Sequence, residues 1–284
     1  MMKEEEEEWS LVIEPKTGLF NLHLDDLWRY RDLIYMFVKR EYVSQYKQTI
    51  LGPIWFLVQP VLTTVTYIII FGGIAKIPTD GLPQPLFYMS GILMWNYFST
   101  CLNKTSDTFI ANANIFGKVY FPRLTVPIAT VISGLISYFI QLVLFVGVYI
   151  YYLWNGAAIQ PNAYVLLLPY LIFLMAMLGL ALGIIISSLT TKYRDLKFLV
   201  TFGVQLFMYA TPVIYPLSVL SDKYKALVLL NPMTSIMETF RFAVLGVGEF
   251  SWSALGYSTA FTAVVLAFGV VLFNRIEKSF MDTV

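Results

Sequence analysis

Five long stretches of this chain contain no Asp, Glu, Lys or Arg, and this charge pattern constrains the fold more than any other feature. The hydrocarbon layer of a bilayer is about 30 Å thick, so a helix needs about 20 apolar residues to cross it. Each stretch is long enough for at least one such helix. The stretches cover residues 48–75, 81–103, 124–191, 198–221 and 250–274.

The stretch 124–191 is long enough for two crossings. Trp154-Asn155-Gly156 and Gln160-Pro161-Asn162 form a turn signal in its middle, which ends one predicted helix at Leu153 and begins another at Ala163. The sequence therefore predicts six transmembrane helices in an all-α polytopic membrane protein. A membrane β-barrel would instead alternate apolar and polar residues over segments of about ten residues, and 61–71 does not.

Composition supports this class and excludes several chemistries. Hydrophobic residues make up 58% of the chain and charged residues only 13%, against about a quarter charged in soluble domains. Cys101 is the only cysteine and His23 the only histidine. No intrachain disulfide, Cys/His zinc site or histidine-based triad can therefore form, and we expect structural roles for both residues.

The distribution of Lys and Arg predicts the orientation in the membrane. With the N-terminus in the cytoplasm, six spans return the C-terminus there, and fifteen of the nineteen basic residues lie inside. This bias matches the positive-inside rule. The basic residues that lie outside in this topology are Lys76, Lys223, Lys225 and Arg241.

The chain also contains a predicted interface helix before the first span. Leu27, Tyr30, Ile34 and Phe37 recur at spacings of three and four, which is typical of an amphipathic helix. Such a helix lies at the cytoplasmic membrane interface or packs on the protein's own loops, and both interpretations remain open. The predicted parts are a flexible acidic lead (1–24), the interface helix (25–48) and the transmembrane domain (49–284).

The segment between the fifth and sixth spans, about 217–250, has an unusual pattern. Two apolar pieces, 226–230 and 233–245, flank Asn231-Pro232, and each is too short to cross a bilayer. They predict a pair of re-entrant half-helices, with Glu238 and Arg241 paired on one helical face. A surface hairpin with an ordinary salt bridge is the alternative.

No nucleotide-binding G-x-x-x-x-G-K-[ST] motif occurs, and no charge lies in the middle of a span. The chain therefore lacks a phosphate cradle and a proton relay, so energy for any transport comes from elsewhere. Aromatic residues gather on the second and fifth spans, where they form an interfacial belt or line a path for sugars. The candidate channel aromatics are Phe87, Tyr88, Trp95, Tyr97, Phe98, Phe202, Phe207, Tyr209 and Tyr215.

Several short motifs follow one another in a distinctive order. They are 50–55 (ILGPIW), 118–123 (KVYFPR), 193–196 (YRDL), 212–216 (PVIYP), 231–233 (NPM) with Phe240-Arg241 and Gly246, and 275–282 (RIEKSFMD). From about Leu24 to Val284 the chain resembles the membrane subunit of type-2 ABC exporters for cell-surface polysaccharides, the O-antigen, capsule and teichoic-acid group.

This resemblance implies a non-enzymatic subunit of a bacterial inner-membrane exporter. It implies a homodimer around one channel, bound on its cytoplasmic side by two copies of an ATPase subunit that holds ATP and Mg²⁺. This chain itself then carries no cofactor, no metal and no catalytic residue, and binds no nucleic acid. The substrate is a polysaccharide linked to a lipid of the undecaprenyl-pyrophosphate type, and membrane lipid surrounds the subunit.

The resemblance also assigns roles to individual residues. A cytoplasmic coupling helix and its neighbours receive the movement of the ATPase, a basic rim meets the lipid pyrophosphate, and the re-entrant pair shapes the exit. The coupling residues are Asn112, Phe116, Lys118, Tyr120, Phe121, Pro122, Arg123, Tyr193, Arg194 and Asp195. The rim residues are Arg29, Arg31, Lys39 and Arg40, and the residues at the exit are Asn231, Pro232, Glu238 and Arg241.

Three other functions compete with this interpretation. Export of teichoic acid, a drug or a small lipid would use the same six-span plan. An integral-membrane glycosyl or acyl transferase would need paired carboxylates or a metal site at a membrane face, and the sequence shows only scattered carboxylates. A structural scaffold is the last alternative, and co-purification with an ATPase would separate transport from both non-transport classes.

Overall fold

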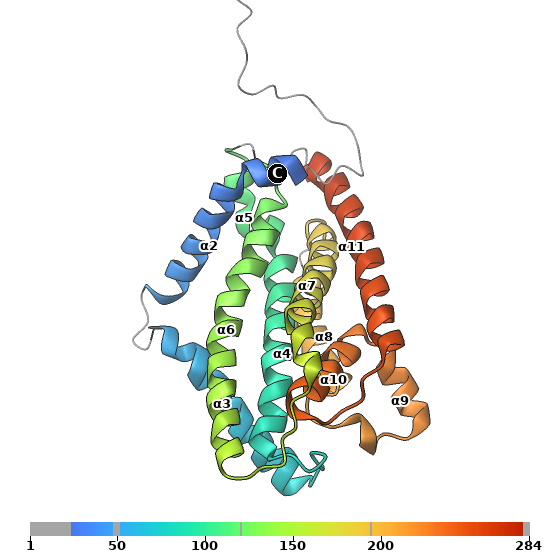
Figure 1. Cartoon of the computed structure of the whole chain (residues 1–284). Coiled ribbons are helices and arrows are strands. Elements are labelled where there is room, and N and C mark those ends of the chain that lie inside the picture. The colour runs from blue at the N-terminus through green and yellow to red at the C-terminus, as the bar shows by residue number, and fades with distance from the viewer. Residues whose placement is uncertain (1–23, 48–51, 120, 194, 281–284) are drawn as a thin grey trace, which may run out of the picture.

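The computed structural model describes residues 24–47, 52–119, 121–193 and 195–280, and within them all regular structure is helical (Figure 1). Several sequence predictions lie outside the described residues. They concern the acidic lead 1–23, the junction 48–51, Tyr120, Arg194 and the last residues 281–284.

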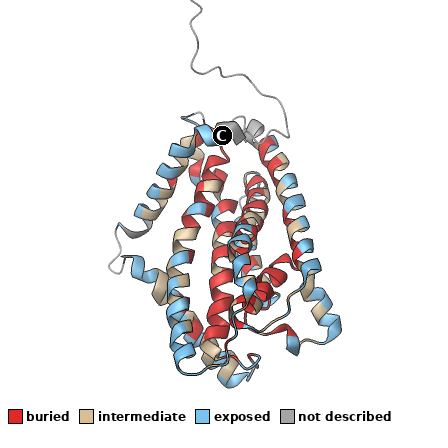
Figure 2. Cartoon of the chain, in the orientation of Figure 1, coloured by how far each residue is buried: buried red, intermediate tan, exposed pale blue. Residues whose placement is uncertain are grey.

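Helix α4 (Gln84–Ser106) is the centre of the fold and is buried along most of its length (Figure 2). It packs between α6 (Thr125–Trp154) and α7 (Leu168–Thr190). Small residues on α7 permit the close approach, because a Cβ atom on Gly183 would lie only 2.5 Å from Cβ of Thr105. Small residues at helix contacts are typical of membrane proteins.

Helix α11 (Trp252–Phe280) covers another face of α7. Gly269 allows the backbone of α11 to approach α7 closely, because a Cβ atom on Gly269 would lie 3.0 Å from the side chain of Ile184. Nearer its end, Phe273 stacks on Phe109 with ring centroids 4.7 Å apart. Helices α6, α4, α7 and α11 thus form the packed body of the protein.

Two apolar helices lie at the margin of this body and bury little of their own surface. Helix α3 (Trp55–Tyr67) is extended by η1 (Gly52–Ile54) and by the π-helical η2 (Ile68–Ile74), and only Pro60 and Thr64 of α3 are buried. Helix α8 (Leu196–Tyr209) buries only Val204. The two helices meet where the Tyr67 hydroxyl lies 3.3 Å from the sulfur of Met208.

Four helices in the described part of the chain are long and apolar enough to span a bilayer: Gly52–Ile74, Thr125–Trp154, Ala163–Thr190 and Trp252–Ile276. The last turn before α7 is the 3-10 helix η3 (Ala163–Leu167). Helix α4 has 23 residues and is about 35 Å long, but it carries more polar side chains. Four of the six predicted spans thus correspond to helices of membrane-spanning length and composition.

The fifth span, predicted within the uncharged stretch 198–221, is present only as a shorter apolar helix. Helix α8 ends at Tyr209 after 14 residues and is about 21 Å long. A turn follows, and η4 (Leu217–Val219) comes after Pro216. Pro212 and Pro216 cannot donate helix hydrogen bonds and disfavour helical geometry in the residue before them, which explains why the helix stops.

The described chain has two opposite ends, which we name the α5 end and the α9 end (Figure 1). The α5 end contains α1 (Leu24–Arg29), α5 (Thr108–Phe116) and the connection from α7 to α8. The C-terminal part of α11 lies at the same end (Figure 1). The α9 end contains α9 (Asp222–Leu229) and α10 (Pro232–Leu245).

The predicted interface helix is present but is interrupted at Tyr30, where α1 ends and α2 (Arg31–Tyr46) begins. One face packs on the protein, with Phe37 buried and Leu33 packed against the core. The opposite face leaves Tyr35 and Met36 exposed. One face thus packs on this chain as the second interpretation predicted, and another apolar face remains open for the membrane interface.

Candidate functional site

Two segments predicted to couple to an ATPase meet at the α5 end. The Lys197 ammonium at the start of α8 lies 2.6 Å from Oδ2 of Asp107, directly before α5. The Thr190 hydroxyl at the end of α7 donates a hydrogen bond of 3.1 Å to the carbonyl of Ser106. The α4–α5 turn and the α7–α8 connection are therefore joined by one ion pair and one hydrogen bond.

Helix α2 joins the same end through two more contacts. The Arg40 guanidinium donates to Oδ1 of Asn112 at 3.3 Å, and the Lys104 ammonium lies 2.6 Å from a carboxylate oxygen of Glu41. Arg40 also lies over the ring of Phe37, 4.7 Å from its centroid. Four elements, α2, α4, α5 and α8, are thus connected by polar contacts within a short distance of α5.

The coupling residues divide into an interior group and a surface group. Phe116 and Phe121 pack with ring centroids 5.7 Å apart, and Arg123 lies over Phe116 at 5.5 Å. The interior group holds α5 in place, and the surface group is free to meet a partner. Asn112, Phe116, Phe121 and Arg123 are buried, Pro122 is half-buried, and Lys118, Tyr193 and Asp195 are exposed.

The residues predicted to couple lie partly on α5 and partly after it. The helix begins at Thr108 and ends at Phe116, and 117–119 and 121–124 are irregular or turn residues that lead toward α6. The sequence interpretation consequently missed the exposed residues Ala111 and Asn114, which lie three apart and continue to Lys118 at helical spacing. That period was visible in the sequence and identifies the face of α5 that the protein leaves uncovered.

The basic rim lies on α1 and α2, and all four of its predicted residues are exposed. Arg31 lies over the ring of Trp28 at 5.5 Å from its centroid. Arg40 points toward α5 and is held there by Asn112. Arg31 and Lys39 therefore lie on the open side of the helix, and Arg40 contributes to its attachment.

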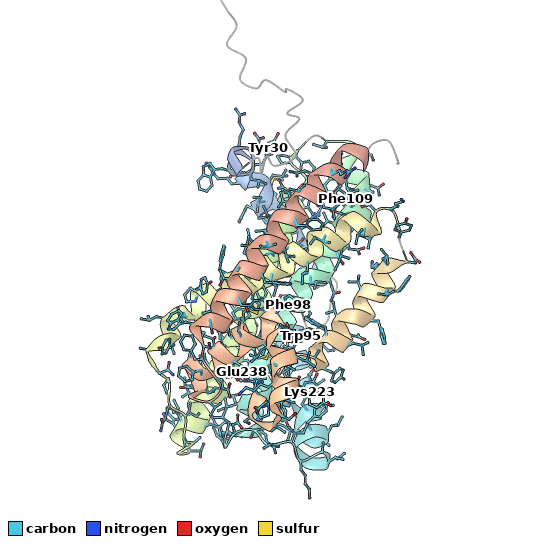
Figure 3. All side chains as sticks on the ribbon, turned by 90° about the vertical axis from the view of Figure 1, so that its right-hand side faces the viewer. Tyr30, Trp95, Phe98, Phe109, Lys223 and Glu238 are labelled. Carbon is cyan, nitrogen blue, oxygen red and sulfur yellow. The ribbon has the colours of Figure 1, made fainter. Side chains whose placement is uncertain are left out.

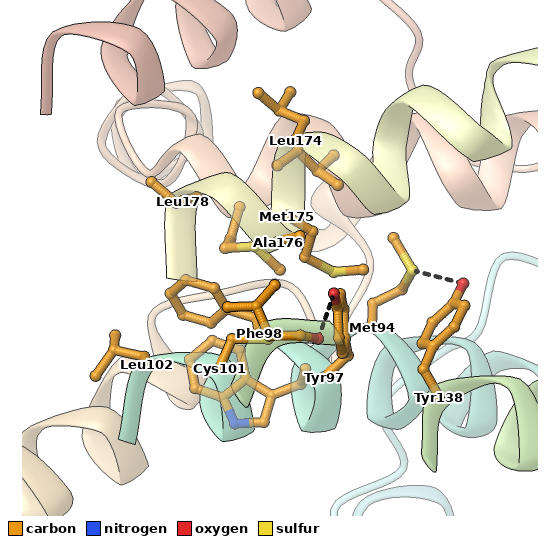
Figure 4. Packing of buried hydrophobic residues seen from close by; sticks show 14 of the residues in the cluster. Met94, Tyr97, Phe98, Cys101, Leu102, Tyr138, Leu174, Met175, Ala176 and Leu178 are labelled. Atoms are coloured by element: carbon orange, nitrogen blue, oxygen red, sulfur yellow. Dashed lines mark hydrogen bonds between the residues drawn. The ribbon is translucent and has the colours of Figure 1, made fainter. Parts of the chain in front are cut away.

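The predicted channel aromatics are separated by the fold. Those on α4 are buried and fill the core, as Figure 4 shows for Tyr97 and Phe98 beside Met175. For the α4 rings, the prediction of a channel lining is therefore corrected to a packing role, because a buried ring does not face a channel in this conformation. Phe87, Tyr88, Trp95, Tyr97 and Phe98 are buried, Phe207 and Tyr215 are half-buried, and Phe202 and Tyr209 are exposed.

At the α9 end, Asn231 and Pro232 begin helix α10 as their residue types predict. The Asn231 side chain accepts a hydrogen bond of 3.0 Å from the amide of Met233 and donates one of 2.8 Å to the hydroxyl of Thr211. Pro232 is the first helical residue, and Gly246 ends the helix with a left-handed φ of 76°. The predicted break at Asn231-Pro232 thus separates α9 from α10.

Arg241 is the most densely bonded side chain at this end and is 1% exposed. Its guanidinium donates to the carbonyls of Pro212 at 2.6 Å and Val213 at 2.9 Å, and to the Ser90 hydroxyl at 3.2 Å. It also lies over the ring of Phe87, 3.9 Å from its centroid. One side chain thus connects α10, α4 and the turn after α8.

The predicted pair of Glu238 and Arg241 is present, with Nη1 3.4 Å from Oε1. The second oxygen of Glu238 accepts a hydrogen bond of 3.2 Å from the amide of Glu249. Gly91 on α4 makes room for the backbone that Arg241 binds, because a Cβ atom on Gly91 would lie 2.6 Å from the carbonyl oxygen of Val213. Sequence reasoning missed Ser90 and Gly91, since neither belongs to a recognisable motif.

The described residues bring together no group of three or more His, Cys, Asp or Glu side chains that could hold a metal ion. The charged side chains instead form pairs or contacts between helices. The polar contacts described at both ends therefore connect helices.

Comparison with known proteins shows which family has this arrangement. The family model for ABC-2 type transporters matches residues 32–245. An O-antigen export system permease protein of Myxococcus xanthus is 30% identical over 219 residues, which cover 76% of this chain and 81% of that protein. A protein of the same name from Klebsiella pneumoniae is 23% identical over 253 residues, covering 88% of this chain and 94% of that protein.

A polysialic acid transport protein of Escherichia coli is 22% identical over 247 residues, which cover 86% of this chain and 93% of that protein. The alignments with all three relatives include most of both chains. Together with the family match and the apolar helices, they establish the class of the protein. The chain belongs to the ABC-2 type transporter family and is a multi-pass membrane protein.

Proposed function

We propose that the chain is the channel-forming membrane subunit of an ATP-driven exporter that moves a lipid-linked polysaccharide out of the bacterial cytoplasm across the inner membrane. The family and the names of the relatives support polysaccharide export. The observation that carries the proposal is the α5 end, where a short helix with one exposed face is bonded to the elements that lead into the apolar helices.

The α5 end faces the cytoplasm, as the positive-inside rule predicts from the excess of Lys and Arg there. In this arrangement α4 and α8 complete six spans with the four apolar helices. Helices α9 and α10 then form a re-entrant pair at the outer surface. The buried position of α10 supports this placement, because its polar groups are satisfied inside the protein.

The partner ATPase binds the exposed face of α5, at Ala111, Asn114 and Lys118, together with the exposed Tyr193 and Asp195. ATP and Mg²⁺ are held by that partner. Movement of α5 passes to α8 through the pair of Asp107 and Lys197, and to α2 through Asn112 and Arg40. Each link is a direct contact, so no intermediate element has to carry the displacement.

A second copy of this chain completes the channel. Helices α3 and α8 lie at the margin of the fold and expose large apolar side chains, among them Leu62 and Ile69 of α3 and Phe198 and Phe202 of α8. The two helices contact each other where the Tyr67 hydroxyl meets the sulfur of Met208, so their exposed apolar side chains lie on neighbouring helices. In the dimer, the apolar surfaces of the two copies and the aromatic rings of α8 between them form the walls of the polysaccharide path.

The lipid pyrophosphate enters at the basic rim of α1 and α2. Arg31 and Lys39 lie on the side of these helices that faces away from the body of the protein. Guanidinium and ammonium groups bind phosphate by charge-assisted hydrogen bonds, and basic residues at this surface are also attracted to anionic lipid. The exposure of Tyr35 and Met36 supports a position of the same helix at the apolar boundary of the membrane.

The decisive test measures ATP hydrolysis by the chain alone, and with its candidate ATPase, in lipid nanodiscs with and without the lipid-linked polysaccharide. We expect no hydrolysis by the chain alone, a stable complex with the ATPase, and stimulation by the glycan lipid. Asn114→Arg should weaken the complex, whereas Lys223→Glu at the opposite end should not. Absence of any complex would contradict the proposal, and stimulation only by a drug or a small lipid would change the substrate.

A further inference from the structure

A pocket of about 450 Å³ lies at the α9 end between α9, α10 and the first turns of α11. Glu238 and Lys223 mark this end of the molecule in Figure 3. The volume lies within the range of about 300–1,000 Å³ that is typical of small-molecule sites. The pocket is separate from the α5 end and from the apolar surface of α3 and α8.

The charges at this pocket are neutralised in pairs. Glu238 is paired with the buried guanidinium of Arg241 and accepts the amide of Glu249. The Glu249 carboxylate is paired with the ammonium of Lys225 on α9. No net charge therefore remains among these four side chains, and the site suits neither a phosphate group nor a bare cation.

Hydroxyl groups and apolar surface make up much of the remaining wall. The hydroxyls come from Ser235, Thr239, Ser251 and Ser253, and the apolar surface from leucine side chains of α9. Ser251 and Ser253 hydrogen-bond to each other at 2.8 Å. Each hydroxyl can donate once and accept twice, so the pair keeps capacity for a ligand.

Tyr257 contributes an aromatic ring to the same wall and is 40% exposed. Its hydroxyl donates a hydrogen bond of 3.0 Å to the carbonyl of Leu230 at the end of α9. This bond fixes the ring across the gap between α9 and α11. A fixed ring presents a flat apolar face beside hydroxyl groups, and an aromatic side chain with a bound polar tip is suited to such mixed surroundings.

From this combination we infer that the pocket is a binding site for neutral saccharide units of the exported glycan as they leave the channel. Sugar rings carry hydroxyls at their edges and apolar C–H groups on their faces, which match the serine hydroxyls and the ring of Tyr257. This inference rests on the proposed function, since it assigns an outer binding site to the same substrate.

The test measures binding of lipid-free oligosaccharides, released by mild acid from the host's own surface polysaccharide, to the full chain in complex with its ATPase in nanodiscs. Tyr257→Ala should weaken the affinity by about tenfold, because the fixed ring is lost. Ala254→Trp should abolish binding by filling the pocket. Tyr224→Ala, at an exposed tyrosine of α9 outside the pocket, is the matched control and should leave binding unchanged.

A second readout separates this inference from the proposed function. ATP hydrolysis stimulated by the intact glycan lipid is measured on the same variants. Equal oligosaccharide binding by the wild type, Tyr257→Ala and Ala254→Trp would overturn the saccharide site, even when stimulation is intact. Failure to form the ATPase complex, with pocket-dependent oligosaccharide binding retained, would overturn only the exporter assignment. Tyr257→Phe should bind more strongly than Tyr257→Ala, which confirms that the ring carries the effect.

Discussion

The α5 end and the α9 end both use charged side chains to join helices, but they place them in opposite surroundings. The ion pairs Lys104–Glu41 and Lys197–Asp107 leave between a quarter and a half of each side chain open to solvent. The pair of Arg241 and Glu238 is almost completely enclosed. Exposed pairs contribute about 0–1 kcal/mol, whereas removal of one partner from a buried pair costs about 3–5 kcal/mol.

From this difference in burial we infer that the α5 end can move and that the α9 end is fixed. Weak exposed contacts can break and form again when a partner displaces α5, at little cost in free energy. The contacts of Arg241 hold α10 and the turn after α8 against α4 throughout. In the proposed orientation, transport would then move the helices of the α5 end relative to an α9 end that stays assembled.

The largest expected effect comes from Arg241→Ala. This change removes the ion-pair partner of Oε1 of Glu238 and the donor to the carbonyls of Pro212 and Val213, so we expect a loss of about 3–5 kcal/mol in the free energy of unfolding. Unfolding in mixed micelles measures it. Lys223→Ala, at an exposed cation of α9, should change the stability by less than about 0.5 kcal/mol.

The double variant Glu238→Leu with Arg241→Met sharpens the same comparison. It removes both charges, and we expect it to be more stable than Arg241→Ala alone because no unpaired carboxylate remains. A double variant as unstable as Arg241→Ala would mean that the bonds to the turn, and not the ion pair, hold the outer region together.

The next effect concerns the helices that connect the two ends. Gly183→Ala should cost about 1–3 kcal/mol, because its Cβ atom would lie 2.5 Å from Cβ of Thr105 and would push α7 away from α4. The control is Gly147→Ala on α6, whose Cβ atom would meet no atom within 4 Å. Equal melting temperatures of the two variants would contradict the close packing of α4 and α7.

A smaller effect is expected at the start of α10. Asn231→Ala removes the hydrogen bond to the amide of Met233, which costs about 1 kcal/mol for a helix cap. Ser221 precedes α9 at the equivalent position but makes no capping bond with its side chain. Ser221→Ala should therefore leave the thermal unfolding temperature unchanged, and an equal drop in both variants would argue against the cap.

The smallest effect on stability, and the most informative for function, is expected at the α5 end. Lys197→Ala should change the free energy of unfolding by at most about 1 kcal/mol. In the complex it should nevertheless reduce glycan-stimulated ATP hydrolysis, because α5 and α8 lose a contact. The exchange Asp107→Lys with Lys197→Asp should restore it, and failure of both effects would remove this pair from the coupling path.

The sequence predicted the membrane class and several boundaries well, because long uncharged stretches and turn residues are local signals. The third span, predicted at 126–153, is helix Thr125–Trp154, and the predicted break at Asn231-Pro232 begins α10. The extent of the fifth span was less predictable. Absence of charge does not distinguish a helix from an apolar turn, and Pro212 rather than Asp222 decides where α8 ends.

The candidate sites were predicted only in part, because their contacts join distant parts of the chain. The pair of Glu238 and Arg241 was visible at a spacing of three residues. The bond from Arg241 to Ser90 spans 151 positions and follows no periodic pattern. The aromatic cluster of α4 shows the same limit, since a ring that lines a channel and a ring that fills a core have the same local sequence.

The short helix α8 has a consequence for the depth at which the chain turns. At about 21 Å it falls short of a hydrocarbon layer of about 30 Å, so in the proposed six-span topology the turn after Tyr209 would begin within the apolar layer. Water is absent there, and exposed carbonyl groups need another donor. The guanidinium of Arg241 donates hydrogen bonds to the carbonyls of Pro212 and Val213 in place of water. An irregular segment can therefore lie at this depth without unsatisfied carbonyl groups.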